Sequence, residues 1–80
     1  MVQHDINDLR YNSLRPFIIL LDETTAVGVT YIGKAIPGTA TSSIGWQISK
    51  VDETGNLIMK WVDDGRFTQI WDNRVSLSYQ

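Results

Sequence analysis

The chain has 80 residues, of which 42% are hydrophobic, and its formal net charge is −2. A chain of this length forms one domain at most, and it buries only about 60% of the surface that its unfolded form exposes. Seven basic and nine acidic residues are mixed along the sequence. The basic stripe that holds a phosphate backbone is therefore missing, and direct nucleic-acid binding is not expected.

The residue inventory also restricts how so small a domain is stabilised. Cysteine is absent and histidine occurs once, at His4, which argues against disulfides and against metal sites built from thiolate or imidazole ligands. Small scaffolds without these devices often depend on oligomerisation. The longest strongly apolar run, residues 16–21, is far shorter than the ~20 residues of a membrane span and lacks the flanks of a signal peptide. We therefore expect a homo-oligomer that does not enter a membrane.

Residues 1–15 are predicted to form a polar N-terminal arm, and residues 16–80 a single small β domain. Ile6 and Leu9 have the spacing of one helical face. Asparagine and serine weaken a helix, however, and Pro16 restricts its end, so an extended arm is favoured. Such an arm either frays or lies against a neighbour. In an oligomer it is the expected docking segment.

Two strands are predicted in the first half of the β domain. Residues 17–21 are continuously apolar, which indicates a strand covered on both faces. A polar break at residues 22–25 precedes a second strand at residues 27–34, where valine and tyrosine alternate with other residues. The longest loop, residues 36–43, contains Pro37-Gly38, a pair that fits the centre of a type II turn.

The second half contains the clearest hairpin. Residues 44–51 and 57–62 alternate as strands around the turn residues Thr54-Gly55-Asn56. The spacing of Phe67, Ile70 and Trp71 indicates one helical turn that closes an end of the core, and a last strand is predicted at residues 75–79. About five short antiparallel strands predict an all-β fold, either a small barrel or a sandwich.

The residues that most often carry chemistry are poorly placed for it. His4 lies in the arm, where a catalytic base is not held in position. Asp63 and Asp64 precede a glycine, so they are interpreted as a solvated turn rather than as an acid–base pair or, with Asp72, a cation site. The serines lack a base and a nucleophile elbow. We therefore expect no catalytic residue, cofactor or metal, and not an enzyme.

The three tryptophans are open to two interpretations, a packed core or a platform that stacks on sugars. Trp46 and Trp61 lie on strand faces with aliphatic neighbours and are predicted to be core residues. Trp71 is more open, because polar residues follow it directly. Arg74 is expected to pair with Asp72 or Asp63, or to stack on an indole.

Several segments of the chain carry a family resemblance. They are Tyr31-Ile32-Gly33-Lys34-Ala35, Pro37-Gly38-Thr39-Ala40-Thr41-Ser42, Trp46-Gln47-Ile48 and the closing Trp71-Asp72-Asn73-Arg74-Val75-Ser76-Leu77-Ser78-Tyr79. Together they resemble small virion structural proteins of tailed bacteriophages, over about residues 27–79. The resemblance implies a non-enzymatic virion component, made in the host cytoplasm and present in many copies. Its position in the capsid, neck, tail or fibre base stays open.

The expected partners are other copies of the chain and other virion proteins, bound by arm docking or by pairing at an edge strand. The residues predicted to bind partners are Phe17, Ile19 and Leu21 in the first strand, and Trp71, Arg74 and Tyr79 near the C-terminus. Two alternatives stand beside this function. One is a carbohydrate-binding module that aids host recognition, and the other is a small regulator of a host protein.

Overall fold

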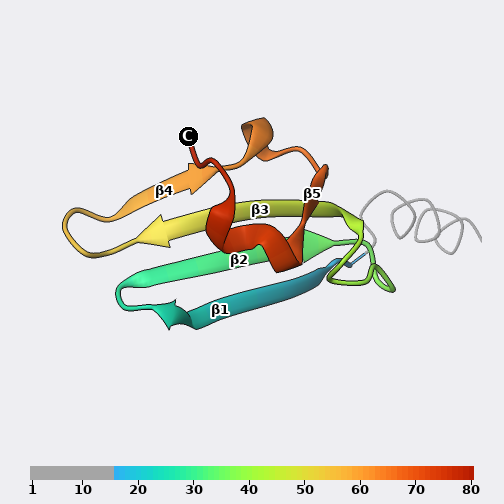
Figure 1. The fold of residues 1–80 in the computed structure, drawn as a ribbon, viewed down its shortest axis with the longest axis horizontal. Helices are drawn as coiled ribbons and strands as arrows, with labels where there is room; N and C mark the ends of the chain where they lie inside the picture. The colour runs from blue at the N-terminus through green and yellow to red at the C-terminus, as the bar shows by residue number, and fades with distance from the viewer. Residues whose placement is uncertain (1–15) are drawn as a thin grey trace, which may run out of the picture.

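The computed structural model describes residues 16–80, which form five strands and two short 3-10 helices (Figure 1). The elements in chain order are β1 (Ile18–Ala26), β2 (Val29–Ala35), β3 (Ile44–Asp52), β4 (Ile58–Trp61), η1 (Asp63–Gly65), β5 (Gln69–Ile70) and η2 (Trp71–Ser76). The predicted all-β fold class is confirmed. The predicted arm, residues 1–15, lies outside the described residues.

The strands form an antiparallel meander in the order β1-β2-β3-β4. The long strand β3 also pairs with β5, which bonds to its first residues, whereas β4 bonds to its last ones. Beyond η2, the backbone of Gln80 exchanges two hydrogen bonds with that of Trp61 at the outer edge of β4. The sheet is not closed into a barrel. The sequence predicted either a barrel or a sandwich, and the observed layers are consistent with a small sandwich.

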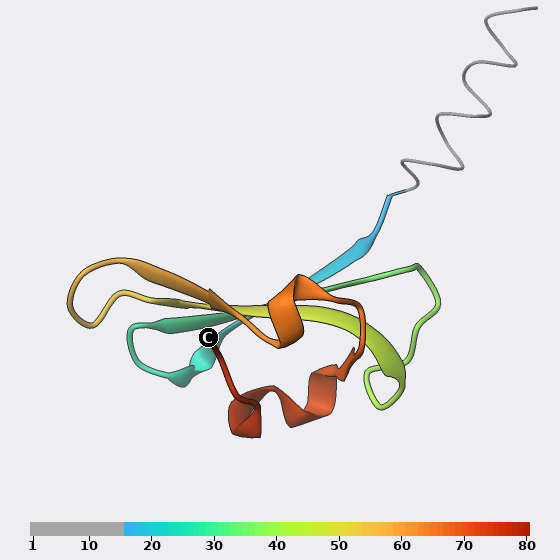
Figure 2. The same cartoon turned by 90° about the horizontal axis from the view of Figure 1, so that it is seen from above.

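The second layer is thin and lies mostly on one face of the sheet, whereas η1 packs at one end of the other face beside Gln47 and Trp61. After β5 the chain turns into η2, which lies on one side of the strands (Figure 2). We call the side under η2 the covered face and the other side the open face. Because successive side chains of a strand point to opposite faces, each strand contributes one row of side chains to each side.

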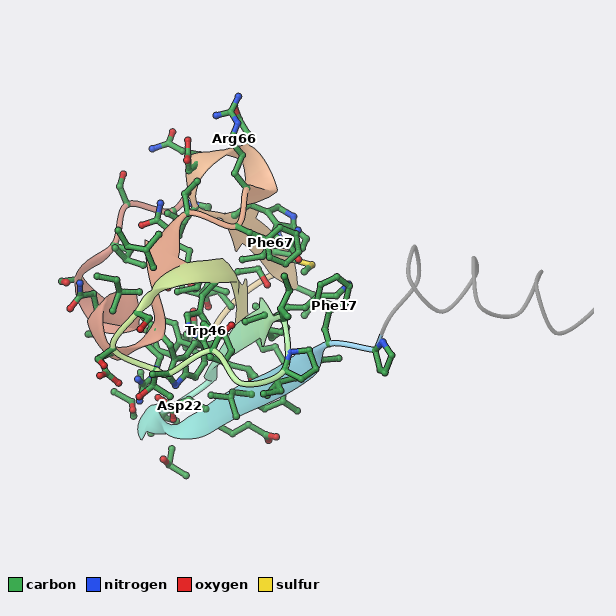
Figure 3. All side chains as sticks on the ribbon, turned by 90° about the vertical axis from the view of Figure 1, so that its right-hand side faces the viewer. Phe17, Asp22, Trp46, Arg66 and Phe67 are labelled. Atoms are coloured by element: carbon green, nitrogen blue, oxygen red, sulfur yellow. The ribbon has the colours of Figure 1, made fainter. Side chains whose placement is uncertain are left out.

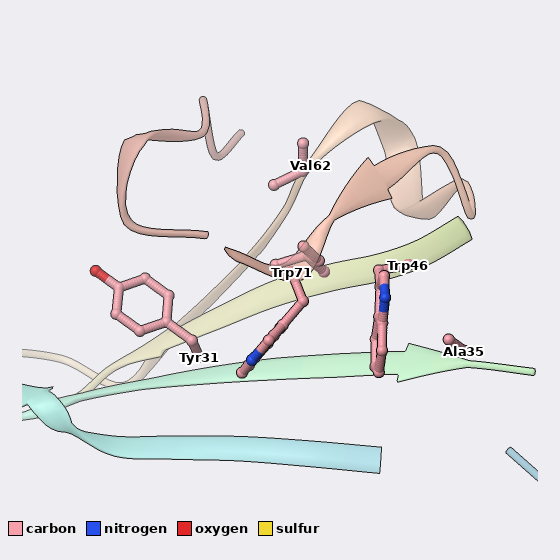
Figure 4. Packing of buried hydrophobic residues seen from close by; sticks show 6 residues of the cluster. Tyr31, Ala35, Trp46, Val62 and Trp71 are labelled. Atoms are coloured by element: carbon pink, nitrogen blue, oxygen red, sulfur yellow. The ribbon is translucent and has the colours of Figure 1, made fainter. Parts of the chain in front are cut away.

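The core lies between the sheet and η2. Its buried apolar residues are Tyr31, Ala35, Trp46, Ile48, Val62 and Trp71. The indoles of Trp46 and Trp71 are tilted against each other with their ring centroids 6.0 Å apart (Figure 4). The prediction that Trp46 is a core residue is confirmed, since only 1% of it is exposed. Its Nε1 also donates to the carbonyl oxygen of Ala40, which ties the long loop to the core.

Two turns follow the predicted chemistry. The amide of Thr39 donates to the carbonyl of Ile36, and Gly38 has a φ of 94°, as the third position of a type II turn requires. The hairpin between β3 and β4 also forms where the turn residues were found. The polar break predicted at residues 22–25 is wrong, because β1 continues through it with a bulge. Asp22 supports this bulge by accepting hydrogen bonds from Thr24 and Thr25.

Three other expectations about local structure are corrected. The first strand is not covered on both faces, because η2 packs on one side only and leaves Ile19 and Leu21 exposed. The helical turn expected from Phe67 to Trp71 is replaced by β5, since residues 69–70 pair with β3 and the helix begins at Trp71. The final strand expected at residues 75–79 is absent, because residues 71–76 form η2.

Candidate functional site

The open face of the sheet is the most unusual surface of residues 16–80. The register places Leu21 beside Ile32 and Val51 beside Met59, all on this side. Its apolar side chains are Phe17, Ile19, Leu21, Ile32, Val51, Met59, Trp61 and Phe67. Six of them, all but Ile32 and Val51, are between 36% and 59% exposed. A contiguous apolar surface of this kind marks a binding site more often than scattered single residues do.

One end of the open face is aromatic. Phe17 and Phe67 stack with their ring centroids 5.4 Å apart and their planes 21° from parallel (Figure 3). The Nζ atom of Lys34 lies 4.8 Å from the centre of the Phe17 ring. Nearby, Gln47 donates from Nε2 to the carbonyl oxygen of Gly65, which holds η1 against this end of the sheet. The two stacked rings therefore form an aromatic border at this end of the face.

Half of the predicted partner-binding residues lie on this surface. Phe17, Ile19 and Leu21 occupy alternate positions at and just before β1, so their side chains share the open face. The structure thus brings three predicted residues together on one accessible surface. Their role in binding stays a prediction.

The other half lies on the covered side and makes internal contacts. Trp71 is only 6% exposed. The hydroxyl of Tyr79 donates to the carbonyl oxygen of Arg74 at 2.6 Å, and its ring packs near that of Tyr31. Burial raises the pKa of Tyr79, and the neighbouring Tyr31 hydroxyl adds to this rise. These contacts account for Trp71 and Tyr79 within the fold, and partner binding by them stays a prediction.

Arg74 joins η2 to the bulge of β1. Its Nε donates to Oδ2 of Asp22 at 2.9 Å, and its Nη1 donates to the carbonyl oxygen of Trp71. Its guanidinium carbon also lies 4.6 Å from the centre of the Trp71 ring, so the predicted stacking on an indole is confirmed. The predicted ion pairs with Asp72 or Asp63 are replaced by one with Asp22, which lies 52 residues away in the sequence.

Asp22 is ionised in this setting. Hydrogen bonds from the Thr25 hydroxyl, the Thr24 amide and Arg74 hold the pKa of its carboxyl well below the ordinary value of 3.8. Only 8% of the residue is exposed, but every oxygen of the carboxylate has a donor. The pair acts as a clasp between the first strand and the C-terminal segment, so we assign it a structural role.

The sequence analysis did not identify three exposed residues of the open face, Met59, Trp61 and Phe67. Trp61 was predicted to be a core residue, and this is wrong, because its register partner Ser49 places it on the open face with 36% of it exposed. Phe67 was assigned to a plug of the core, and it stacks on Phe17 instead. The sequence around β4 contained a signal for this surface. Both alternating rows there are largely apolar, so an apolar row on the face away from the core was to be expected.

The acidic residues near η1 form a local turn network. Asp63 accepts hydrogen bonds from the Thr68 hydroxyl and from Arg66, which lower the pKa of its carboxyl. Asp63 and Asp64 both have a positive φ, so the predicted turn is present. Within residues 16–80 there is no group of three acidic or histidine side chains that could hold a metal ion. The same part of the chain forms no pocket. His4 is outside it.

The helical elements of residues 16–80 are too short and too polar to cross a membrane. Comparisons of the chain with protein-family models, with curated proteins and with solved structures found no match.

Proposed function

We propose that this protein is a non-enzymatic assembly protein that binds other proteins through the open face of its sheet. The single observation that carries this proposal is the exposed apolar surface itself. Fully burying an aromatic side chain removes about 150–250 Å² of accessible surface, and the same range serves as an approximation for the large aliphatic side chains. With the exposures seen here, the six most exposed side chains present roughly 550 Å², at the upper end of the largest patches on monomeric proteins, about 300–600 Å².

The proposed setting is the virion of a tailed bacteriophage, where the chain is a structural component. The resemblance of residues 27–79 to small virion proteins supports this setting. An assembly role is also physically consistent with the fold. Large apolar side chains of the open face, such as Ile19, Leu21 and Met59, are left in water, and a partner that covers this face removes their apolar area from water.

The test is incorporation into particles. Virions assembled with the full-length chain are purified, washed in salt and analysed by quantitative mass spectrometry. We expect a fixed number of copies per particle. The Ile19→Lys variant should incorporate poorly, because it places a charge in the apolar row that β1 contributes to the open face. Val75→Lys is the matched control, since Val75 is 57% exposed and Ile19 58%, but Val75 lies in η2. A chain that is abundant in the lysate and absent from washed particles would contradict the proposal and favour a regulator of a host protein.

The exposed aromatic end of the open face favours a second candidate, a carbohydrate-binding module. Trp61, Phe17 and Phe67 offer accessible rings, and aromatic faces are suited to stacking on sugars. Trp46 and Trp71 are buried, so Trp61 is the one indole within residues 16–80 that a glycan would reach. Tryptophan fluorescence that shifts on addition of glycans, and that no longer shifts in Trp61→Phe, would establish this candidate in place of the first.

A further inference from the structure

The size and shape of the open face indicate what kind of partner covers it. The face is broad, spanning strands β1 to β4, and no pocket indents residues 16–80. A broad sheet face with exposed apolar side chains can pack against another sheet at about 10 Å, as in β-sandwiches. The open face of a second copy has the same size and composition. Two copies would bury about 1,100 Å² through the six exposed side chains, just above the roughly 1,000 Å² that a biological interface needs.

The charges at the two ends of the open face are complementary to each other. Lys34 lies beside Ile19 at the aromatic end. Glu23 is exposed at the start of the bulge of β1, two residues beyond Leu21 and about 13 Å along the strand from Ile19 at 3.3 Å per residue. Leu21 and Ile32, which lie between these charges on β1 and β2, are apolar. A two-fold axis that runs across the strands reverses their direction in the second copy. It therefore places Lys34 of each copy over the Glu23 end of the other, and keeps like charges apart.

We propose that the open face binds the open face of a second copy of the chain, with the strands of β1 antiparallel and Leu21 near the two-fold axis. The inference rests on the proposed function and names its first partner. An interface in which each copy uses the same patch is the commonest way in which soluble proteins form dimers. The product is a symmetric β-sandwich in which each copy supplies one sheet and carries its own η2 on the outside.

The first test is the mass of the full chain by sedimentation equilibrium over a wide range of concentrations. We expect a reversible monomer–dimer equilibrium. Ile19→Lys should raise the dissociation constant by at least about 100-fold, because the substituted side chain enters the interface twice. Val75→Lys should leave it within about threefold of the wild-type value. A chain that remains monomeric at all concentrations overturns the inference, and so does a dimer that both variants retain, since it would use another surface such as the edge of β1.

The arrangement of the two copies has a separate test. Glu23→Lys and Lys34→Glu should each weaken the dimer by about tenfold, because each places like charges opposite one another. The double variant should recover to within about threefold of the wild type. If the double variant dimerises more weakly than both single variants, the antiparallel arrangement is overturned. These two side chains are exposed or half-buried at the ends of the face, so circular dichroism should show an unchanged fold.

A chemical cross-link tests the position of the axis. The chain has no cysteine, so Leu21→Cys introduces a single thiol. A bis-maleimide with a spacer of about 10 Å, the separation of packed sheets, should join two copies efficiently, whereas Val75→Cys should not be joined. Equal cross-linking of the two variants overturns the inference. A monomeric chain that is still incorporated into virions would overturn the self-association alone and leave the proposed function standing.

Discussion

Gly33 is the position where a single methyl group should disturb the core most. It lies in β2 on the covered face, directly under the two indoles of the core. A Cβ atom at this position would lie 2.4 Å and 2.6 Å from Cε3 and Cζ3 of Trp71, and 3.1 Å from Cε3 of Trp46. Ordinary contacts between carbon atoms are about 3.5–4.0 Å. The Trp71 ring would therefore have to move by roughly 1 Å to accept alanine.

The ring has little freedom to make this movement. Trp71 is held by Trp46 on one side and by the guanidinium of Arg74, which lies 4.6 Å from its ring centre. Overpacking of a filled core costs about 1–3 kcal/mol. Replacing glycine by alanine returns about 0.4–1 kcal/mol, since it restricts the unfolded chain. We therefore predict that Gly33→Ala lowers the free energy of unfolding by about 1–2 kcal/mol.

Thermal unfolding followed by far-UV circular dichroism measures this effect. For a domain of 60–100 residues, 1 kcal/mol corresponds to about 4–8 °C, so the expected decrease in Tm is roughly 5–15 °C. Gly55→Ala is the matched control, because no atom lies within 4 Å of its Cβ position. It should change stability by no more than about 0.5 kcal/mol. If Gly33→Ala melts at the same temperature as Gly55→Ala, the close packing of the indoles on β2 is refuted.

Three further predictions concern the core, the clasp and the arm. Trp46→Ala should cost about 3–5 kcal/mol in urea denaturation and abolish cooperative unfolding, whereas Trp61→Ala on the open face should cost only about 1–2 kcal/mol; equal losses would contradict their placement. Asp22→Asn should lower the Tm at neutral pH and flatten its decline below about pH 4, because the lowered pKa of Asp22 gives stability that is present above the ordinary pKa of 3.8 and is lost as the pH falls. Arg74→Met should also lower the Tm at neutral pH. If either variant melts at the wild-type temperature, the clasp does not stabilise the fold. Deleting residues 1–15 should leave the circular dichroism of the domain intact and weaken its incorporation into particles.

The fold class and the hairpins were predictable because their signals are local. Glycine and asparagine at residues 55–56 and Pro37-Gly38 specify turns through their own backbone preferences. The alternation around Trp46 identified a core residue correctly, since its neighbours on the other row are polar. These features require no knowledge of the rest of the chain.

The open face was not predictable from the same patterns. In β1 and β4 both alternating rows are largely apolar, so the sequence does not reveal which row faces the core. The row that faces the core is determined by η2 and the last residues of the chain, which pack across one side of the sheet. Trp61 was placed in the core for this reason, although it lies on the other side. The clasp of Asp22 and Arg74 was missed because the two residues are 52 positions apart and no local pattern joins them.

The measurement that tests the central claim most directly is hydroxyl-radical footprinting of the full chain, read by mass spectrometry. Met59 and Trp61 are reactive side chains on the open face, 48% and 36% exposed. Val75 is exposed in η2, outside the proposed contact, and serves as the internal reference. If the open face is the assembly surface, oxidation of Met59 and Trp61 falls as the chain concentration rises and falls further in virions, while oxidation of Val75 does not change. Oxidation of Met59 and Trp61 that stays constant from the dilute chain to the assembled particle would contradict the account.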